Sequence, residues 1–290
     1  MIPAAFDYHR PSSLDEATAL LARLGDSAKV LSGGMSLLPL LKLRLGSVAH
    51  LVDIGRITGL EYVREEGGHL RIGGGTRQAT LERSELIGGR YAILRDAVPL
   101  IADPVVRNRA TVGGNLANGD PGNDLPAVMI ALGASFVARG SKGERTVPAS
   151  QFYKGLFETA LAQDEILTEV RVPTPPARSG GAYFKLKRKV GDFASAAAAV
   201  QLTLDAKGAI ESAAVALTNA GPTPVQAGAA SRALVGRQPD EKLFAEAGRL
   251  AAEVSSPSAD RRGSVEYKRE MARVVVTRAL RKAVERAGGR

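Results

Sequence analysis

The sequence predicts an α+β protein of two domains. At roughly 150 residues per domain, a chain of 290 residues has room for about two. Hydrophobic residues make up 44% of it and charged residues 24%, a balance typical of chains that bury a core. Residues 173–181 contain three prolines and two glycines, which break regular structure and suit a linker. We therefore expect a larger part at residues 1–177 and a smaller C-terminal domain at residues 178–290.

Residues 1–54 have β-α character. Ser12 or Ser13 can cap a helix whose apolar side chains share one face. Pro39 is tolerated in the first turn of a second helix, because the N–H group there has no helical partner. The predicted helices span residues 13–24 and 37–44, and the predicted strands 29–31 and 50–53. These residues form the first of two subdomains, 1–54 and 55–177.

The second subdomain mixes strands, helices and one long polar stretch. The predicted strands are 69–72, 135–139 and 166–172, and the predicted helices 81–87, 92–97 and 126–132. Residues 101–124 are polar and rich in glycine, although apolar segments flank them. A loop of this length inside a compact domain is usually functional or disordered. We expect this stretch to be a functional loop.

The C-terminal domain begins with strands and ends with helices. Apolar runs separated by short turns predict strands at residues 183–190, 194–204 and 210–218. Helical periodicity predicts helices at residues 225–235, 241–254 and 263–286. No internal repeat of fixed period is present.

Several kinds of chemistry are excluded by composition. The absence of cysteine excludes disulfides, cysteine nucleophiles, thiolate zinc sites and iron–sulfur ligation within this chain. The three histidines, His9, His50 and His69, are far apart in sequence, so we expect no metal site built from histidine. The net charge of +9 is compatible with nucleic acid or with an anionic ligand. The chemistry of this protein therefore points to an organic cofactor or a partner.

The N-terminus and the apolar runs carry no targeting signal. No basic stretch followed by an apolar run is present at the start, so we expect no signal peptide. The longest apolar runs, such as residues 194–200, fall well short of the roughly 20 residues that span a bilayer. A cytoplasmic location is the expectation.

A first glycine turn comprises Ser32, Gly33, Gly34, Met35, Ser36 and Leu37. Consecutive backbone N–H groups ahead of a helix suit an anion, and glycine lets the backbone approach a ligand closely. A pyrophosphate fits this geometry. The alternative is that paired glycines only make a tight turn between a strand and a helix. The segment matches neither the dinucleotide fingerprint nor the P-loop.

A second glycine turn comprises Thr111, Val112, Gly113, Gly114 and Asn115. It repeats the same chemistry much later in the chain, so the two turns can face each other across one pyrophosphate. The alternative is a coincidence of two unrelated turns. A third cluster, residues 73–75, lacks a following helix start, and we interpret it as structural.

Three further features have two interpretations each. Asp120 and Asp124 can form a metal-binding pair or an acid–base pair. Alternatively, Asp120 makes a turn, which is the favoured interpretation for it, and Asp124 caps a helix. Residues 183–189 place alternate basic side chains on one strand face, for solvent or for a cofactor anion. Residues 261–290 hold ten Lys and Arg against three Glu. Because aromatic residues that stack on bases are scarce, a solvated helix or subunit surface is favoured there over nucleic-acid binding.

The motifs together resemble a known family. The segments that carry the resemblance, in order, are FDYHRP, LSGGMSLLPLLKLR, VRNRATVGGNLANGDPGNDLPA, YFKLKRKVGDFASAAAAV, LTNAGPTP and ADRRG. They are similar to the FAD-binding medium subunit of molybdenum-containing hydroxylases, nearly from end to end. The opening residues, IADP and GDPGNDLPA look most like the aerobic carbon monoxide dehydrogenase branch of that family.

The resemblance implies a fold and a site. The fold is a two-part FAD-binding domain of the vanillyl-alcohol-oxidase (PCMH) type, followed by a three-stranded antiparallel sheet with a helical bundle. Both glycine turns would hold the FAD pyrophosphate. Ile101 and Leu167 would flank the apolar surface of the flavin, Asp124 and Lys185 would lie near polar parts of the cofactor, and Phe193 would lie close to the isoalloxazine ring. No catalytic residue and no metal ligand is expected on this chain.

Two residues depart from the family pattern. Met35 stands where His or Gln is expected, which affects only a side-chain contact to the cofactor. Phe193 stands where Tyr is expected in carbon monoxide dehydrogenases, so the ring is kept and the hydroxyl is lost.

The resemblance also implies partners. A large subunit with the molybdopterin cofactor would oxidise the substrate, and a small subunit would carry [2Fe–2S] clusters, in a dimer of heterotrimers. FAD would pass electrons from these clusters to an external acceptor, in the cytoplasm or at the inner face of the membrane. The best match for the complex is carbon monoxide oxidation to carbon dioxide. The alternatives are a related N-heterocycle or aldehyde hydroxylase, a free-standing FAD oxidoreductase, or a basic nucleic-acid or phosphate-binding module.

Overall fold

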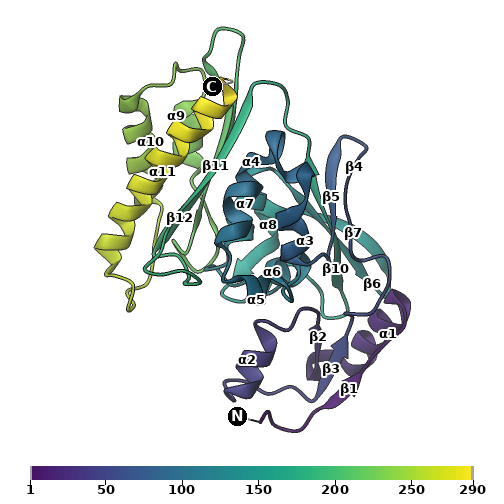
Figure 1. Ribbon diagram of the computed structural model, residues 1–290. Coiled ribbons are helices and arrows are strands. Elements are labelled where there is room, and N and C mark those ends of the chain that lie inside the picture. Colours follow the sequence, from purple (N-terminus) through teal and green to yellow (C-terminus); the bar gives the residue numbers. More distant parts are fainter. Residues whose placement is uncertain (1, 289–290) are drawn as a thin grey trace.

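The computed structural model describes residues 2–288 (Figure 1). A small α/β unit with the N-terminus lies at one end, a five-stranded sheet with helices lies in the middle, and a second sheet with three helices lies beside it. The chain is thus an α+β protein, as the sequence predicts. Among these residues no helix combines the length and the apolar character needed to cross a membrane.

The N-terminal unit is a three-stranded parallel sheet with two helices. Its elements are β1 (Asp7–His9), α1 (Leu14–Leu24), β2 (Ala28–Leu31), α2 (Leu37–Lys42) and β3 (His50–Asp53), with the strands in the order β1-β3-β2. Ser13 caps α1, because its side chain accepts a hydrogen bond of 3.2 Å from the N–H of Glu16. Helix α2 ends two residues before the prediction, since Arg44 adopts a left-handed conformation (φ 56°).

The middle part is built on an antiparallel sheet. Its strands are β4 (Val63–Glu66), β5 (His69–Gly73), β6 (Ser135–Gly140), β7 (Gly143–Pro148) and β10 (Ile166–Pro173), in the order β4-β5-β10-β6-β7. Its longer helices are α3 (Gln78–Arg83), α4 (Ala92–Ala97) and α7 (Asp124–Ala131), and α8 (Ala149–Phe152) leads into the hairpin of β8 (Tyr153–Gly155) and β9 (Glu158–Thr159). The helix predicted at 81–87 has the wrong bounds. Helix α3 begins three residues earlier and ends before Ser84, whose backbone is extended, and only a 3₁₀ turn follows.

The stretch 101–124 is not the long loop that the sequence predicts. It folds into two short helices, α5 (Pro104–Arg107) and α6 (Val112–Ala117). Asp103 caps α5 with a bond of 2.9 Å from the N–H of Val106, and Thr111 caps α6 with a bond of 3.1 Å from the N–H of Gly114. Helices this short lack the apolar periodicity from which the sequence identifies a helix.

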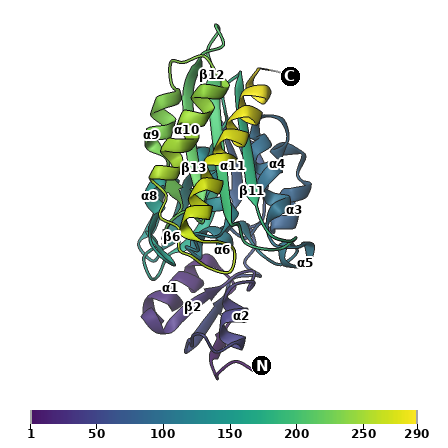
Figure 2. The ribbon, with the colours of Figure 1, turned by 90° about the vertical axis from the view of Figure 1, so that its left-hand side faces the viewer.

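The C-terminal part is an antiparallel sheet covered by helices. The strands β11 (Ser179–Leu186), β12 (Ala196–Leu204) and β13 (Ile210–Thr218) are joined by a two-residue strand, β14 (Val225–Gln226), where the sequence predicts the start of a helix. The helices are α9 (Gly228–Leu234), α10 (Glu241–Glu253) and α11 (Val265–Ala287). They cover one face of the sheet, and α4 and α7 pack on the other (Figures 1 and 2).

The first strand of this sheet begins earlier than predicted, at Ser179 rather than Tyr183. Gly180 belongs to β11 and faces α11 so closely that a Cβ there would lie 2.6 Å from the backbone nitrogen of Ala287. The glycines that indicate a linker in the sequence therefore allow a helix to approach a strand. Residues 187–193 lie in the loop between β11, which ends at Leu186, and β12, so the strand predicted at 183–190 is wrong over residues 187–190.

The middle and C-terminal parts share a core. One apolar cluster contains residues of α7, β10 and β12, among them Val128, Val170 and Ala197. The two parts are therefore packed as one body around this cluster, and the boundary between them is not a flexible connection.

Candidate functional site

The two glycine turns lie against each other where the N-terminal unit meets the middle part. The Oγ of Ser32 and the Oγ1 of Thr111 form a hydrogen bond of 2.9 Å. A Cβ on Gly33 would overlap the carbonyl oxygen of Arg109 and lie 2.8 Å from the Cα of Ala110. Only glycine therefore fits at position 33, since any side chain would separate the two turns. The structure brings together the two turns that the sequence predicts to share one ligand.

The first glycine turn presents unused donors. Within residues 2–288, no hydrogen-bond partner lies near the backbone N–H groups of Gly33, Gly34, Met35 and Ser36. Four successive N–H groups without protein partners carry partial positive charge, and such runs of free N–H groups bind phosphate oxygens in other proteins. Met35 takes part through its backbone, so the departure from the family pattern at its side chain leaves this donor in place.

The second glycine turn uses its donors within the protein. The N–H of Val112 donates to Thr76 (2.9 Å), that of Gly113 to Gly74 (2.8 Å), and that of Asn115 to Thr111 (3.0 Å). The expectation that the second turn repeats the N–H chemistry of the first is therefore wrong, because bonds to the segment 74–76 and to Thr111 occupy the N–H groups of Val112, Gly113, Gly114 and Asn115. Among the side-chain atoms of this turn, the buried Oδ1 of Asn115 has no hydrogen-bond partner.

The glycines at 73–75 have a packing role. A Cβ on Gly113 would lie 2.6 Å from the carbonyl oxygen of Gly74, and a Cβ on Gly74 would overlap the carbonyl oxygen of Leu167. The backbone of the second glycine turn thus rests on the glycine run, which rests on β10. Because side chains at either Gly74 or Gly113 would push these backbones apart, both glycine clusters are needed to place the second glycine turn.

A cavity of about 260 Å³ opens beside the first glycine turn. Its lining residues are Tyr8, Leu31, Ser32, Gly33, Leu38, Asp53, Gly55, Arg56, Arg77 and Arg109. Burial lowers the pKa of Arg77, and the guanidinium of Arg109 adds to that effect. Three arginines against one aspartate line the cavity, which gives it a local excess of positive charge. An anion near the turn would be stabilised by this charge. The sequence analysis missed the three arginines, because nothing local marks residues that only the tertiary fold brings to one cavity.

Asp124 and Lys185 form a buried ion pair. The Nζ of Lys185 lies 2.8 Å from Oδ2 of Asp124, with the two side chains 2% and 4% exposed. The hydroxyl of Tyr183 donates to the other carboxylate oxygen over 2.6 Å, and Lys185 also donates to the carbonyl of Leu100 over 3.1 Å. Burial raises the pKa of Asp124, and the ammonium of Lys185 opposes that rise.

The role of Asp124 differs from the helix cap of the sequence analysis. Asn123 precedes α7 as its N-cap residue, and the carboxylate of Asp124 points at β11 instead. The pair thereby ties the middle part to the C-terminal sheet. Asp120 makes a turn, since its carboxylate accepts from the N–H of Gly122 over 2.8 Å. The described residues contain no group of three or more Asp, Glu or His side chains placed to hold a metal ion.

The remaining predicted residues lie in two settings. Ile101 and Leu167 are buried, at 6% and 4% exposure, in the core of the middle part. Phe193 is 45% exposed, and its ring lies beside Gly122, where a Cβ would be 3.0 Å from it. Gly191 lies beside the carbonyl of Ala102, so the 187–193 loop reaches the residue after Ile101.

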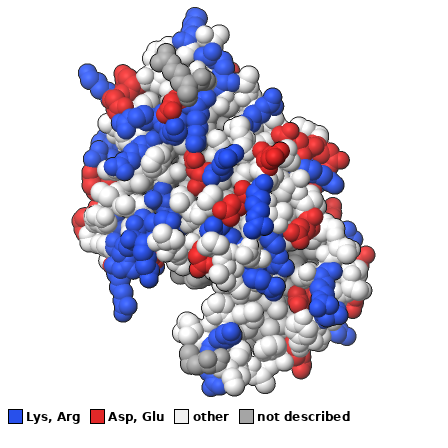
Figure 3. All heavy atoms as spheres, viewed as in Figure 1, with Lys and Arg blue, Asp and Glu red and all other residues white. Residues whose placement is uncertain are grey.

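The basic side chains of residues 261–288 are largely paired. Figure 3 shows Lys and Arg gathered over the C-terminal part, with acidic side chains among them. The ion pairs are Arg262–Asp192, Lys268–Asp260, Arg273–Glu270, Arg281–Glu241, Lys282–Glu285 and Arg286–Asp96. Pairs of this kind support the solvated-helix and subunit-surface interpretations.

Two family models cover nearly the whole chain. Residues 4–175 match the FAD binding domain in molybdopterin dehydrogenase, and residues 181–283 match the CO dehydrogenase flavoprotein C-terminal domain. The two matches meet at the segment that precedes and begins β11.

Relatives and a solved structure agree with these matches. The chain is 46% identical to the carbon monoxide dehydrogenase medium chain of Afipia carboxidovorans, with 99% of each chain covered. It is 36% identical to the caffeine dehydrogenase subunit beta of a Pseudomonas species, covering 99% of this chain and 97% of that subunit. It superposes on the carbon monoxide dehydrogenase of Hydrogenophaga pseudoflava, in a form that lacks the Mo-pyranopterin moiety, with a TM-score of 0.96, 46% identity and 99% of each chain covered. The chain therefore belongs to the family of FAD-binding medium subunits of molybdenum hydroxylases.

Proposed function

We propose that this chain holds FAD and relays electrons from the [2Fe–2S] clusters of a partner subunit to an external acceptor. The observation that carries the proposal is the row of four N–H groups without partners in the first glycine turn. This turn contacts the second through the hydrogen bond between Ser32 and Thr111. This geometry fits a pyrophosphate bound to the N–H groups of residues 33–36, beside the contact with residues 111–115. The second turn contributes the Thr111 hydroxyl, which can donate to a phosphate oxygen.

The chain's own residues bind and orient the cofactor. FAD, when bound, exchanges electrons singly or in pairs. The unused N–H groups would fix its phosphates, and the cavity arginines, Arg56, Arg77 and Arg109, would add positive potential nearby. Ile101 and Leu167 would flank apolar parts of the cofactor, Asp124 and Lys185 would set the charge near it, and Phe193 would pack against the ring system.

The substrate of the complex is oxidised on another chain. A large molybdopterin subunit and a small [2Fe–2S] subunit would assemble with this chain as a dimer of heterotrimers, in the cytoplasm or at the inner face of the membrane. The 46% identity to a carbon monoxide dehydrogenase medium chain supports carbon monoxide as the substrate of that complex. The 36% identity to a caffeine dehydrogenase subunit supports an N-heterocycle as the second candidate.

The experiment is a visible absorption spectrum of the native protein, purified through a tag on this chain, with the chains counted on a denaturing gel. The proposal predicts flavin and iron–sulfur absorbance together and two further chains. Flavin with a single chain would favour a free-standing oxidoreductase. A colourless protein that takes up no FAD on incubation would contradict both the proposed electron-transfer subunit and the free-standing oxidoreductase.

The division of the chain is part of the proposal. We propose that residues 1–177 form the FAD-binding domain, with subdomains 1–54 and 55–177, and that residues 178–290 form the C-terminal domain. Limited proteolysis tests the boundary: we expect primary cleavage in the exposed turn at residues 176–178, where Arg178 has a left-handed conformation (φ 61°), and the two fragments are expected to stay together through their shared core. Primary cleavage inside β12 or α7 would contradict it.

A further inference from the structure

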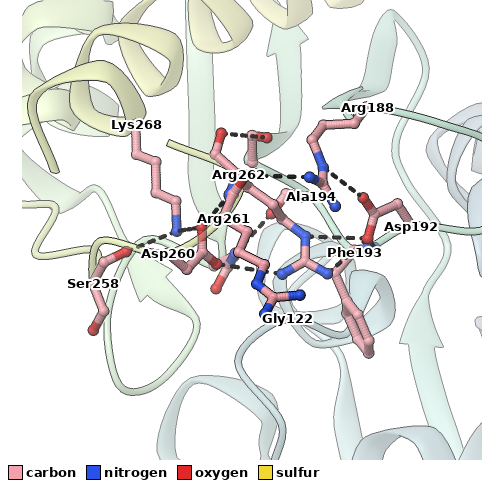
Figure 4. A network of polar contacts seen from close by, with 12 residues as sticks. Gly122, Arg188, Asp192, Phe193, Ala194, Ser258, Asp260, Arg261, Arg262 and Lys268 are labelled. Carbon is pink, nitrogen blue, oxygen red and sulfur yellow. Dashed lines mark hydrogen bonds and ion pairs between the residues drawn. The ribbon is translucent and has the colours of Figure 1, made fainter. Parts of the chain in front are cut away.

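An aromatic ring at the end of the 187–193 loop is held in place by charge. Phe193 follows Asp192, and its half-exposed ring lies with the guanidinium of Arg262 5.8 Å from its centroid (Figure 4). Arg262 comes from the segment before α11, far along the chain from the loop. An arginine over a ring at this distance is attracted to the negative face of the aromatic ring.

Asp192 connects the arginine to the loop. Its Oδ1 accepts from Nη2 and Nε of Arg262, over 2.7 and 3.1 Å, and from the backbone N–H of Phe193, over 3.0 Å. Its Oδ2 accepts from Nε of Arg188 over 3.2 Å. The Arg262 guanidinium, with Arg188 beside it, lowers the pKa of Asp192 to about 2. The carboxylate is therefore ionised throughout the physiological range, and it binds the ring-bearing residue by its backbone.

Arg262 is itself anchored to α11. Its Nη1 lies 3.3 Å from Oδ2 of Asp260, and its N–H donates to Oδ1 of the same residue over 2.7 Å. Asp260 in turn pairs over 2.9 Å with Lys268, whose buried ammonium also donates to the carbonyl of Ser258 over 2.7 Å. The chain of contacts runs from a buried lysine in α11 to the half-exposed ring (Figure 4).

The contacts of Arg262 and Asp192 hold the part of the 187–193 loop that packs on the segments next to Asp124 and Ile101. The Phe193 ring packs on Gly122, in the turn that leads to Asp124, and Gly191 packs beside Ala102, next to Ile101. If Arg262 only connected the loop to the segment before α11, its ion pair with Asp192 would be sufficient. Here the same guanidinium also lies over the ring, so it constrains the orientation of the ring as well as the backbone.

We infer that Arg262 is a positioning residue of the flavin site, which holds the Phe193 ring against the FAD isoalloxazine through its contacts with Asp192 and with the ring. The inference rests on the proposed FAD binding. Loss of the guanidinium releases both the backbone and the ring of Phe193, and the flavin then loses its aromatic neighbour. Lysine keeps the charge at position 262 but lacks the planar fork that grips Asp192 through two nitrogens.

The test uses a fluorescent reporter in the flavin site. Tyrosine quenches flavin emission when it lies against the ring system, whereas phenylalanine does not. In Phe193→Tyr, bound FAD is expected to lose most of its emission relative to the wild-type chain. In Phe193→Tyr/Arg262→Gln the emission returns, and FAD binding weakens by up to about tenfold, because the flavin loses its packing against one aromatic ring. Phe193→Tyr/Arg262→Lys gives an intermediate emission.

The control is Arg261→Gln in the same Phe193→Tyr background. Arg261 is exposed, and Arg188 bonds only its backbone carbonyl. Its loss is expected to leave the emission quenched and FAD affinity unchanged. Emission is measured at saturating FAD and affinity by titration, both on variants whose circular dichroism matches the parent, which separates positioning from folding.

Three outcomes decide the inference. Restored emission in the Arg262→Gln background with quenching kept in Arg261→Gln supports it. Equal quenching in both backgrounds at saturating FAD overturns it, because the ring then stays in place without Arg262. Absence of quenching in Phe193→Tyr alone, with FAD bound, also overturns it, since the ring does not reach the flavin. A wild-type chain that binds no FAD removes the proposed function itself.

Discussion

The side-chain oxygens of Ser32 and Thr111 lie 2.9 Å apart, although 79 residues separate them in sequence. Ser32 follows the end of β2 in the N-terminal unit, and Thr111 caps α6 in the middle part. Their bond marks the contact between the N-terminal unit and the middle part, each of which has its own sheet. The candidate phosphate site lies at this contact, so it exists only when the two units are packed together.

Replacement of Gly33 by alanine is expected to abolish FAD retention. The added Cβ overlaps the carbonyl of Arg109, so the two glycine turns must move apart. The measurement is the flavin-to-protein ratio of purified variants, with at least a tenfold drop expected. Gly228→Ala is the matched control, because only the flexible end of Arg232 lies near a Cβ at that position. Normal flavin content in Gly33→Ala would contradict the role given to the contact.

Ser32 and Thr111 are expected to be energetically coupled. Thr111→Ala removes the cap of α6 as well as the bond to Ser32, and caps contribute about 0.5–2 kcal/mol. Ser32→Ala removes only the shared bond, which contributes about 1 kcal/mol. A double-mutant cycle of the free energies of unfolding measures the coupling, with about 0.5–1 kcal/mol expected. Additive effects of the two substitutions would show that the bond does not form in solution.

Breaking the Asp124–Lys185 pair is expected to destabilise the chain strongly. Lys185→Met leaves a carboxylate that is 4% exposed without its cation, and such a loss costs about 3–5 kcal/mol. Asp124→Asn/Lys185→Met removes both charges and is expected to recover more than half of that loss. Thermal unfolding of the two variants checks this order. A double variant less stable than Lys185→Met would mean that the pair is not the source of the cost.

The Asp192 contacts are expected to respond to acid. The pKa of this carboxyl falls from an ordinary 3.8 to about 2 in the folded protein. A lowered folded-state pKa means that the stabilisation is complete above about pH 4 and is lost as the pH falls toward 2. Asp192→Asn lacks this dependence, so its stability curve should be flatter than that of the wild type across this window. Acid titrations followed by circular dichroism compare the two, and parallel curves would contradict the assignment.

Much of the fold follows from local sequence patterns. Helix α1 is marked by its Ser13 cap and its single apolar face, and β12 and β13 by long apolar runs between short turns. These signals are visible because periodicity and capping depend on neighbours in sequence. The helices at 104–107 and 112–117 were missed, since each is too short to show a period.

Glycine shows where local interpretation ends. In the sequence, Gly180 indicates an end of regular structure. In the fold it lies inside β11, where the absence of a side chain lets α11 approach closely. The turns at 32–37 and 111–115 were identified as partners by shared chemistry, and the structure brings them into contact. Which turn keeps its N–H groups free depends on the segment 74–76, which no local pattern reveals.

Long-range contacts explain the residues that the sequence analysis missed. Arg56, Arg77 and Arg109 follow different elements and meet only at one cavity. Arg262 lies in the ADRRG segment, which carried the family resemblance without a role, and its contact with Asp192 spans 70 residues. Tertiary packing alone assigns such residues to a site.

The measurement that tests the central claim most directly compares the affinities of the FAD-free protein for FAD and for FMN, which lacks the pyrophosphate and the adenosine. Several charge-assisted bonds from the first glycine turn predict an affinity for FAD at least about 100-fold higher, and competition by ADP. Equal affinities for the two flavins, with no competition by ADP, would contradict the assignment of residues 32–37 and 111–115 to the pyrophosphate.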